Sequence, residues 1–215
     1  MADSFLLQDC LLCEFPSNHY MTIGNRVYYK CTNCSSIFLT KECRLDETSE
    51  KDRYLEHNND VYDERYREFV SPITNYIMKK YTRASNGLDY GSGTGPVIST
   101  VLSENDYSVS QYDPYFSPDK LVLENNYNYI VCCEVIEHFY QPKNEFTNLR
   151  NILKSNGELI CKTEVYNESI EFSQWYYKND PTHVFFYSED TFEWIKNNIG
   201  FSQLTIEGRV IIFKK

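Results

Sequence analysis

One short stretch limits the fold of this chain more than any other. Residues 88–96 read LDYGSGTGP and place three glycines at alternate positions, directly after a strand-like segment. A helix is predicted to begin at Pro96, because apolar residues recur at Val97, Ile98, Val101 and Leu102. Glycines let a backbone approach a ligand without a Cβ clash. A strand, a glycine turn and a helix in this order are typical of the nucleotide-binding unit of a doubly wound sheet.

The glycine spacing distinguishes two kinds of cofactor. The dinucleotide fingerprint G-x-G-x-x-G/A needs Gly or Ala at position 96, which holds proline. An acidic residue two positions before G-x-G-x-G does match, and this pattern resembles motif I of class I S-adenosylmethionine-dependent methyltransferases. The resemblance implies a cofactor-binding loop that contains Asp89, Gly91, Ser92, Gly93 and Gly95.

Two later segments extend the resemblance. Residues 107–112 alternate like a second strand and end at Asp113, where related nucleotide folds use an acid to bind both ribose hydroxyls. Residues 129–138 are similar to motif IV of the same superfamily, where the fourth strand runs into the cofactor crevice. The resemblance therefore implies further cofactor contacts from Asp113, Cys133 and Glu134.

The remaining chain keeps alternating helices and strands. We expect a helix from Pro142 that closes at Gly157, a fifth strand over 157–165, a helix capped by Ser188 and two final strands. The fold class predicted for residues 84–215 is α/β: a Rossmann-like class I methyltransferase sheet with helices on both faces.

One segment departs from the family pattern. Only 15 residues, 114–128, separate Asp113 from the fourth strand, too few for the usual helix and third strand. The acid that would bind the adenine amine is therefore missing or displaced, and Glu124 is a candidate.

Four of the eight cysteines form two C-x-x-C pairs: Cys10, Cys13, Cys31 and Cys34. In a reducing compartment this spacing indicates zinc rather than disulfides. Four thiolates close the tetrahedral shell, so such a zinc is structural and not catalytic. With strand-like segments at 27–29 and 37–39, residues 1–45 are predicted to form a zinc ribbon. It resembles the cysteine-rich N-terminal module of some bacterial methyltransferases.

Residues 46–83 are predicted to form a helical connector or lid. Six apolar residues share one helical face: Tyr62, Tyr66, Phe69, Val70, Ile73 and Ile77. The pair Ser71 and Pro72 leaves open whether this is one kinked helix or two. The charged segment before it is either a solvated connector or a lid that brings Tyr54, His57 and Asn58 to a site.

Charge and hydropathy exclude some classes of function. The 31 acidic and 21 basic residues give a formal net charge of −10, which argues against an electrostatic grip on nucleic acid. No run of 18 apolar residues exists, so we expect no membrane span. The first ten residues lack the positive region of a signal peptide, so we expect a cytoplasmic protein.

The candidate chemistry centres on Glu134, Glu137 and His138. Their offsets would place them on one face of a helical turn, at the end of the fourth strand where ligands bind. The E-x-x-E-H spacing resembles the metal site of ubiquinone-pathway catechol O-methyltransferases. It also resembles small-RNA 2′-O-methyltransferases, which add a distant histidine, and His183 would take that part. The resemblance implies a Mg or Mn ion bound by these four residues.

A histidine base is the alternative to a metal. His183 or His138 would then remove a proton from the acceptor hydroxyl. Substrate binding or a purely structural role also stays open for both, and the aromatic residues around His183 are either a substrate wall or core.

We predict an S-adenosylmethionine-dependent methyltransferase that acts on a small-molecule acceptor, at oxygen. Two alternatives stay open. One is an RNA 2′-O-methyltransferase with a divalent-cation site. The other is a non-catalytic protein that holds the cofactor while its zinc ribbon recruits a protein partner.

Overall fold

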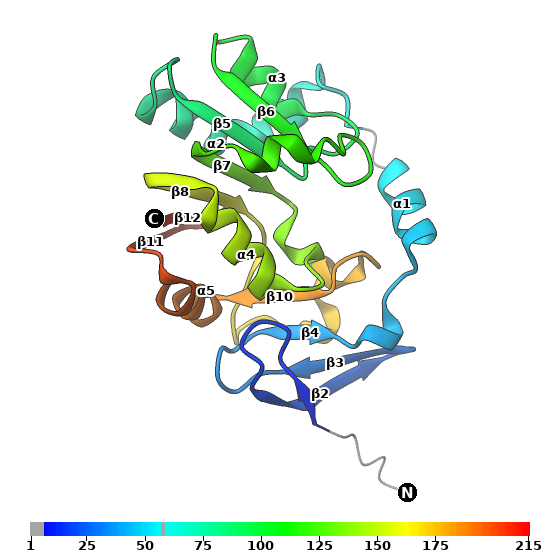
Figure 1. Ribbon diagram of the computed structural model, residues 1–215. Coiled ribbons are helices and arrows are strands. Elements are labelled where there is room, and N and C mark those ends of the chain that lie inside the picture. The colour runs from blue at the N-terminus through cyan, green and yellow to red at the C-terminus, as the bar shows by residue number, and fades with distance from the viewer. Residues whose placement is uncertain (1–6, 57–58) are drawn as a thin grey trace, which may run out of the picture.

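A six-stranded mixed sheet forms the centre of the protein, in the order β11-β12-β8-β7-β5-β6 (Figure 1). The computed structural model describes residues 7–56 and 59–215. Strands β5 to β8 pair in parallel, and β12 lies antiparallel between β8 and β11. The strands are β5 (Asn86–Tyr90), β6 (Ser108–Tyr112), β7 (Tyr127–Cys133), β8 (Leu153–Lys162), β11 (Gln203–Glu207) and β12 (Val210–Lys214).

Helices cover both faces of this sheet. Side chains alternate between the two faces along a strand, so apolar neighbours on a strand pack against helices on opposite sides. On β7, Val131 belongs to a core cluster with α2 and α3, whereas its neighbour Ile130 belongs to the cluster with α4 and α5. The predicted α/β architecture is confirmed. The helices are α2 (Glu64–Lys80), α3 (Val97–Ser103), α4 (Pro142–Asn151) and α5 (Glu189–Ile195).

The structure decides one question that the sequence left open and corrects one prediction. The segment around Pro72 is one helix, since α2 continues through the proline. The predicted helix end at Gly157 was wrong, because α4 ends at Asn151 and β8 begins at Leu153. Gly157 instead lets β8 approach β7 closely: a Cβ there would lie 3.1 Å from the carbonyl oxygens of both Tyr127 and Asn128.

The shortened segment between β6 and β7 is confirmed. It contains one 3-10 turn, η2 (Lys120–Glu124), and β6 is therefore an edge strand. Glu124 is exposed on this turn.

A second sheet joins the N-terminal strands to two strands from the second half of the chain. Its order is β1-β2-β3-β4-β10-β9, and β4 pairs antiparallel with β10, where Phe38 lies opposite Phe185. The N-terminal cysteine segment therefore shares a sheet with strands from the second half of the chain (Figure 1). These strands are β1 (Gln8–Asp9), β2 (Pro16–Ile23), β3 (Arg26–Lys30), β4 (Ile37–Leu39), β9 (Val165–Tyr166) and β10 (Phe185–Ser188).

The connector contains a short helix, α1 (Glu47–Leu55), at the right-hand edge of the view in Figure 1. Its N-terminus is capped by the carboxylate of Asp46, which accepts a hydrogen bond from the Ser49 amide. In the described part of the chain, no helix is long and apolar enough to cross a bilayer.

Candidate active site

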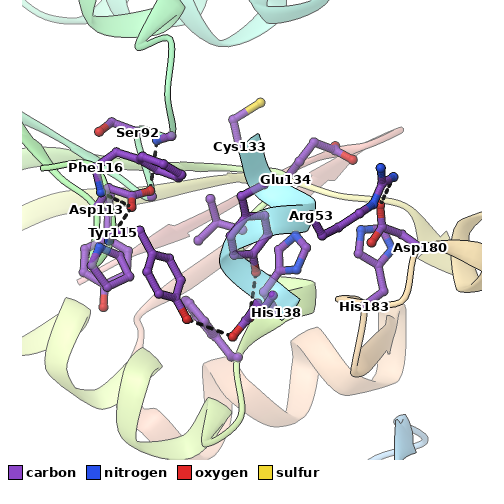
Figure 2. Close-up of a pocket in the computed structure, with 18 of the residues that line it drawn as sticks. Arg53, Ser92, Asp113, Tyr115, Phe116, Cys133, Glu134, His138, Asp180 and His183 are labelled. Atoms are coloured by element: carbon purple, nitrogen blue, oxygen red, sulfur yellow. Dashed lines mark hydrogen bonds and ion pairs between the residues drawn. The ribbon is translucent and has the colours of Figure 1, made fainter. Parts of the chain in front are cut away.

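A cavity of about 1070 Å³ opens at the carboxyl ends of β5, β6 and β7. Its wall includes a residue that directly follows each strand. Gly91 follows β5, and Asp113 and Glu134, both labelled in Figure 2, follow β6 and β7. Carboxyl ends of adjacent parallel strands meet at one edge of a sheet, where ligands of such folds bind. The cavity also reaches His138 and His183, so one space joins the predicted cofactor loop to the predicted catalytic residues.

The glycine loop at one end of the cavity is held by Asp113. One oxygen of its carboxylate accepts from the amide of Gly93, at 3.0 Å, and the other accepts from the amides of Tyr115 and Phe116, at 2.8 and 3.0 Å. Gly91 has a φ of 78°, and a Cβ there would lie 2.5 Å from the Val135 side chain. The loop therefore needs glycine both for its conformation and for close packing.

Two members of the predicted cofactor loop do not line the cavity. Asp89 is buried, and its carboxylate accepts from the amide and hydroxyl of Ser99 at the start of α3. Burial raises the pKa of Asp89 to about 6. Gly95 lies under the connector, where a Cβ would come within 1.7 Å of the Asn59 carbonyl oxygen. Asp89 and Gly95 therefore support the conformation of the loop without lining the cavity.

Glu134 follows β7 with a left-handed backbone, at φ 53°. Its carboxylate pairs with Arg209, at 2.7 Å from Nη2, and accepts from the Tyr177 hydroxyl at 3.3 Å. Burial raises the pKa of Glu134, and the charge of Arg209 opposes that shift. Glu134 also lines the cavity next to Cys133.

Glu137 points into the protein interior and is fully buried. It accepts from Tyr177, and from Thr163 at 3.1 Å. Burial, with a smaller contribution from the charge of Glu134, raises the pKa of Glu137 to about 8. At neutral pH the folded protein therefore holds this carboxyl mainly in its neutral form.

The prediction that Glu134, Glu137 and His138 share a helical face was wrong. Residues Ile136–His138 form a single 3-10 turn, η3, and Glu134 precedes it. The positive φ of Glu134 turns the chain before the helix begins, so offsets counted along a helix do not apply.

The two histidines lie against each other at the other end of the cavity, with ring centroids 4.8 Å apart (Figure 2). His138 Nδ1 is 3.0 Å from the carbonyl oxygen of Thr182, and His183 Nδ1 is 2.6 Å from that of Tyr177. A carbonyl oxygen only accepts, so each Nδ1 carries the hydrogen and a neutral ring has its lone pair on Nε2.

Three of the four predicted ligands of a second metal come together. One ligand atom each from Glu137, His138 and His183 lies within 4.8 Å of the others. Glu134 is outside this group and pairs with Arg209. The cluster has the donor types for a divalent cation, but the neutral Glu137 carboxyl would first have to lose its proton.

The connector covers the cavity. Arg53 of α1 pairs with Asp180 at 2.8 Å, beside His183 (Figure 2). Glu50 of the same helix accepts from the hydroxyls of Tyr54, at 2.8 Å, and Tyr115, at 3.0 Å. The segment predicted as a connector or a lid thus contributes to the wall, whereas two residues named with it, His57 and Asn58, lie outside the described residues.

Sequence reasoning missed Arg53, Glu50 and Arg209. Arg53 and Arg209 meet Asp180 and Glu134 across long stretches of chain, and Glu50 meets Tyr115 in the same way. No motif surrounds any of the three. Tyr177 belongs to the aromatic residues around His183, for which the sequence left a substrate wall and a core role open. Glu124 does not reach the cavity, whereas Glu145, which accepts from Tyr90 at 2.8 Å, does line it.

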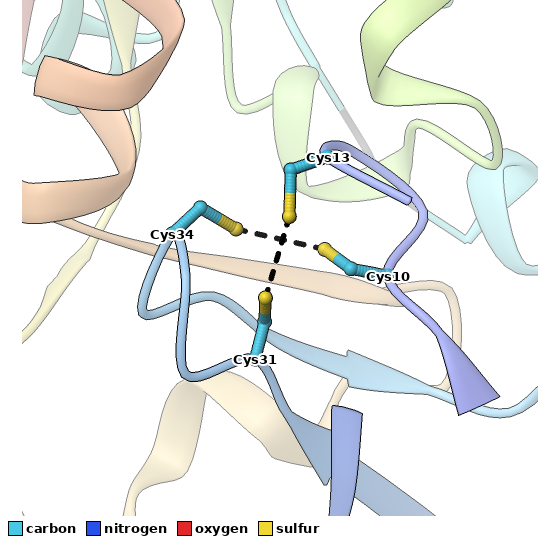
Figure 3. A group of neighbouring side chains, drawn as sticks. All are labelled: Cys10, Cys13, Cys31 and Cys34. Atoms are coloured by element: carbon cyan, nitrogen blue, oxygen red, sulfur yellow. Dashed lines mark hydrogen bonds between the residues drawn. The ribbon is translucent and has the colours of Figure 1, made fainter. Parts of the chain in front are cut away.

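A second group of donors lies away from the cavity. The sulfurs of Cys10 and Cys34 are 3.5 Å apart, those of Cys13 and Cys31 are 3.4 Å apart, and all four point toward one centre (Figure 3). Hydrogen bonds from Cys10 and Cys34 lower the pKa of Cys31. Four converging thiols of this kind match the donor set of a small zinc-binding element.

Comparison with known proteins identifies a family and several similar folds. A family described as "Methyltransferase domain" matches residues 62–206. No curated protein sequence matches the chain. An O-methyltransferase family protein from Burkholderia thailandensis has a similar structure, with a TM-score of 0.55 and 12% identity over 77% of this chain and 61% of that one.

Two other solved structures are similar. A SAM-dependent methyltransferase from Archaeoglobus fulgidus has a TM-score of 0.54 and 16% identity, over 69% of this chain and 94% of that one. Magnesium protoporphyrin IX methyltransferase from Synechocystis PCC 6803, with bound SAH, has a TM-score of 0.53 and 12% identity, over 78% of this chain and 95% of that one. Identities this low show a shared fold. The present chain spans 61% of the length of the Burkholderia protein.

Proposed function

The chain belongs to the methyltransferase-domain family, and on that premise we propose that it transfers a methyl group from S-adenosylmethionine to an oxygen of a small-molecule acceptor. The observation that carries the proposal is the single cavity that runs from the glycine loop to the paired histidines. Its volume of about 1070 Å³ lies just above the usual range of about 300–1,000 Å³ for a ligand pocket, which suits a cofactor and a small acceptor together.

The glycine-loop end of the cavity fits the cofactor. Backbone at Gly91 and Gly93 is open to a ligand, and the Ser92 hydroxyl is buried without a hydrogen-bond partner among the described residues. An orphaned hydroxyl in a cavity wall is a site that a polar ligand can satisfy. Asp113, Cys133 and Glu134 complete this end. Bound cofactor supplies an electrophilic methyl group, and the carboxylates around it favour a positively charged sulfonium.

The histidine end fits proton removal from the acceptor. In our proposal His183, with His138 beside it, accepts the hydroxyl proton at an imidazole nitrogen as the oxygen attacks. Carbonyl oxygens bound to both Nδ1 atoms fix the ring orientations before the acceptor arrives.

A divalent cation at Glu137, His138 and His183 is the alternative way to lower the pKa of the acceptor hydroxyl. Mg and Mn suit such a set, and cation binding there would release the proton of Glu137. Treatment with EDTA under conditions that retain the cysteine-bound metal separates the two mechanisms. Full activity after EDTA supports the histidine base, and activity restored only by Mn or Mg supports the cation.

We further propose that the four cysteines bind zinc in a purely structural site, since a shell of four thiolates leaves no open coordination position. In this proposal residues 1–45 are the zinc ribbon, residues 46–83 the connector that covers the cavity, and residues 84–215 the catalytic domain.

Isothermal titration with S-adenosylmethionine is the first test, and absence of binding would exclude the enzyme. The second is His183→Ala, compared with His19→Ala on β2, a residue that does not line the cavity. The His183 variant should lose turnover on an accepted substrate about 100-fold while its cofactor affinity stays unchanged. Equal turnover in both variants would contradict a role for His183. Retention of the protein on RNA with a steep salt dependence would favour an RNA substrate instead.

A further inference from the structure

We propose that the cysteine module, strands β1 to β4 with their turns, sets the position of His183, and that Arg26 is the positioning residue. The proposal rests on the role proposed above for His183. It goes beyond that role, because it gives the cysteine module a specific task in a reaction to which it contributes no cavity-lining residue.

Arg26 begins β3 and holds the loop that carries His183. Its Nη1 donates to the carbonyl oxygen of Lys178 at 2.6 Å. Its Nη2 donates to the carbonyl oxygens of Asp180, at 3.2 Å, and His183, at 3.4 Å. A guanidinium presents its donors in a rigid planar fork, so one side chain fixes three carbonyls relative to one another. The loop 178–183 is thereby tied to β3.

Backbone hydrogen bonds hold the same loop at its end. The carbonyl of Val184 accepts from the amide of Leu39 on β4 at 2.8 Å, and the Val184 amide donates to the carbonyl of Glu137 at 2.9 Å. The residue after His183 thus bridges the cysteine module and the turn that carries Glu137. Both sides of the histidine pair are connected through it.

The position of the His183 ring depends on the position of this loop. Its Nδ1 bonds the carbonyl of Tyr177, and its Nε2 lies 4.0 Å from Glu137 Oε1. The residue is only 8% exposed, so the packing around it transmits a backbone shift to the ring. A displacement of about 1 Å in a reacting group can cost about 100-fold in rate.

Lys30 offers a matched control. It lies four residues further along β3, on the same side of the strand, and pairs with Glu168 rather than with the loop 178–183. Replacement of Arg26 or Lys30 by methionine removes one cation from the same strand, but only the Arg26 change releases the loop.

The experiment uses the full chain and two readouts for Arg26→Met, Arg26→Lys and Lys30→Met. Hydrogen exchange measures protection of the amides of Thr182, His183 and Val184, which bond to Asp180 and Glu137. This readout does not depend on activity. We expect about a tenfold loss of protection in Arg26→Met, a smaller loss in Arg26→Lys and no change in Lys30→Met.

The kinetic readout should show the same order. In Arg26→Met, kcat should fall by about 10-fold to 100-fold while the Kd for S-adenosylmethionine stays within about twofold, because the cofactor end is not touched. If Arg26→Met does not fold, Arg26→Lys decides, since one ammonium cannot reach all three carbonyls. Wild-type exchange and wild-type kcat in the folded Arg26 variants would overturn the proposal. Lost protection in a protein without methyltransferase activity would instead refute the proposed function and leave the positioning role standing.

Discussion

The neutral carboxyl of Glu137 leads to a prediction about stability and pH. The pKa of Glu137 is raised from 4.5 to about 8 in the folded protein, mainly by burial. As pH rises above 4.5, the unfolded chain releases this proton while the folded chain keeps it. The folded state therefore loses stability relative to the unfolded state until the pH passes about 8.

The size of the effect follows from the shift. Each pH unit within this window costs about 1.4 kcal/mol, so the contribution of Glu137 falls by about 3 kcal/mol between about pH 5 and pH 7. Glutamine has the same shape and does not titrate. Its amide can still bond Thr163 and Tyr177, because a hydroxyl can accept as well as donate. Between about pH 5 and pH 7, the free energy of unfolding of Glu137→Gln should therefore rise by about 3 kcal/mol relative to that of wild type.

Urea unfolding of both proteins at about pH 5, 6 and 7 measures this difference. The control is Glu124→Gln, a surface substitution on the exposed turn η2, which should stay within about 0.5 kcal/mol of wild type. If the gap between Glu137→Gln and wild type stays constant within about 0.5 kcal/mol, Glu137 is ionised in the folded protein. The carboxyl beside the histidines would then not be neutral, and the assignment made above would be refuted.

Three other changes test separate parts of the site. Gly95→Ala should weaken S-adenosylmethionine binding about tenfold in isothermal titration, because its Cβ would meet the Asn59 carbonyl at 1.7 Å, and wild-type affinity would show that the connector moves aside freely. Cys13→Ser should lower both the zinc content measured by plasma mass spectrometry and the Tm, whereas unchanged values would remove zinc from the cysteine site. Glu50→Leu removes the carboxylate to which the Tyr115 hydroxyl donates, so hydrogen exchange in α1 should become faster and the KM for the methyl-accepting substrate should increase. Unchanged exchange would mean that other contacts hold α1 in place.

Features set by neighbouring residues could be predicted from the sequence. The glycine turn after β5, the Ser188 cap of α5 and the missing helix before β7 all depend on a few consecutive residues. The order of the motifs then fixed the parallel arrangement, because the carboxyl ends of adjacent strands must meet at one edge.

The finer arrangement of the site could not be predicted. The offset between Glu134 and Glu137 indicates a shared helical face only if one helix contains both residues. Because Glu134 itself has a left-handed backbone and precedes the turn, no helix contains both. The long-range ion pairs gave no signal either. Arg53 and Asp180 are 127 residues apart, and Arg209 and Glu134 are 75 apart. These ion pairs form only in the folded arrangement of the two sheets, which no local sequence pattern encodes.

The shared sheet also gives this chain an uneven order of assembly. The cysteine cluster closes over a separation of only 24 residues between Cys10 and Cys34, so it can form once this segment has been synthesised. Arg26 and Lys178, by contrast, are 152 residues apart. During synthesis on a ribosome, the edge of β4 that pairs with β10 therefore stays unpaired until most of the chain has emerged. The segment that holds the cysteines is therefore synthesised before the strand that completes its sheet, and until β10 emerges the free edge of β4 is a place where wrong strand pairing can occur.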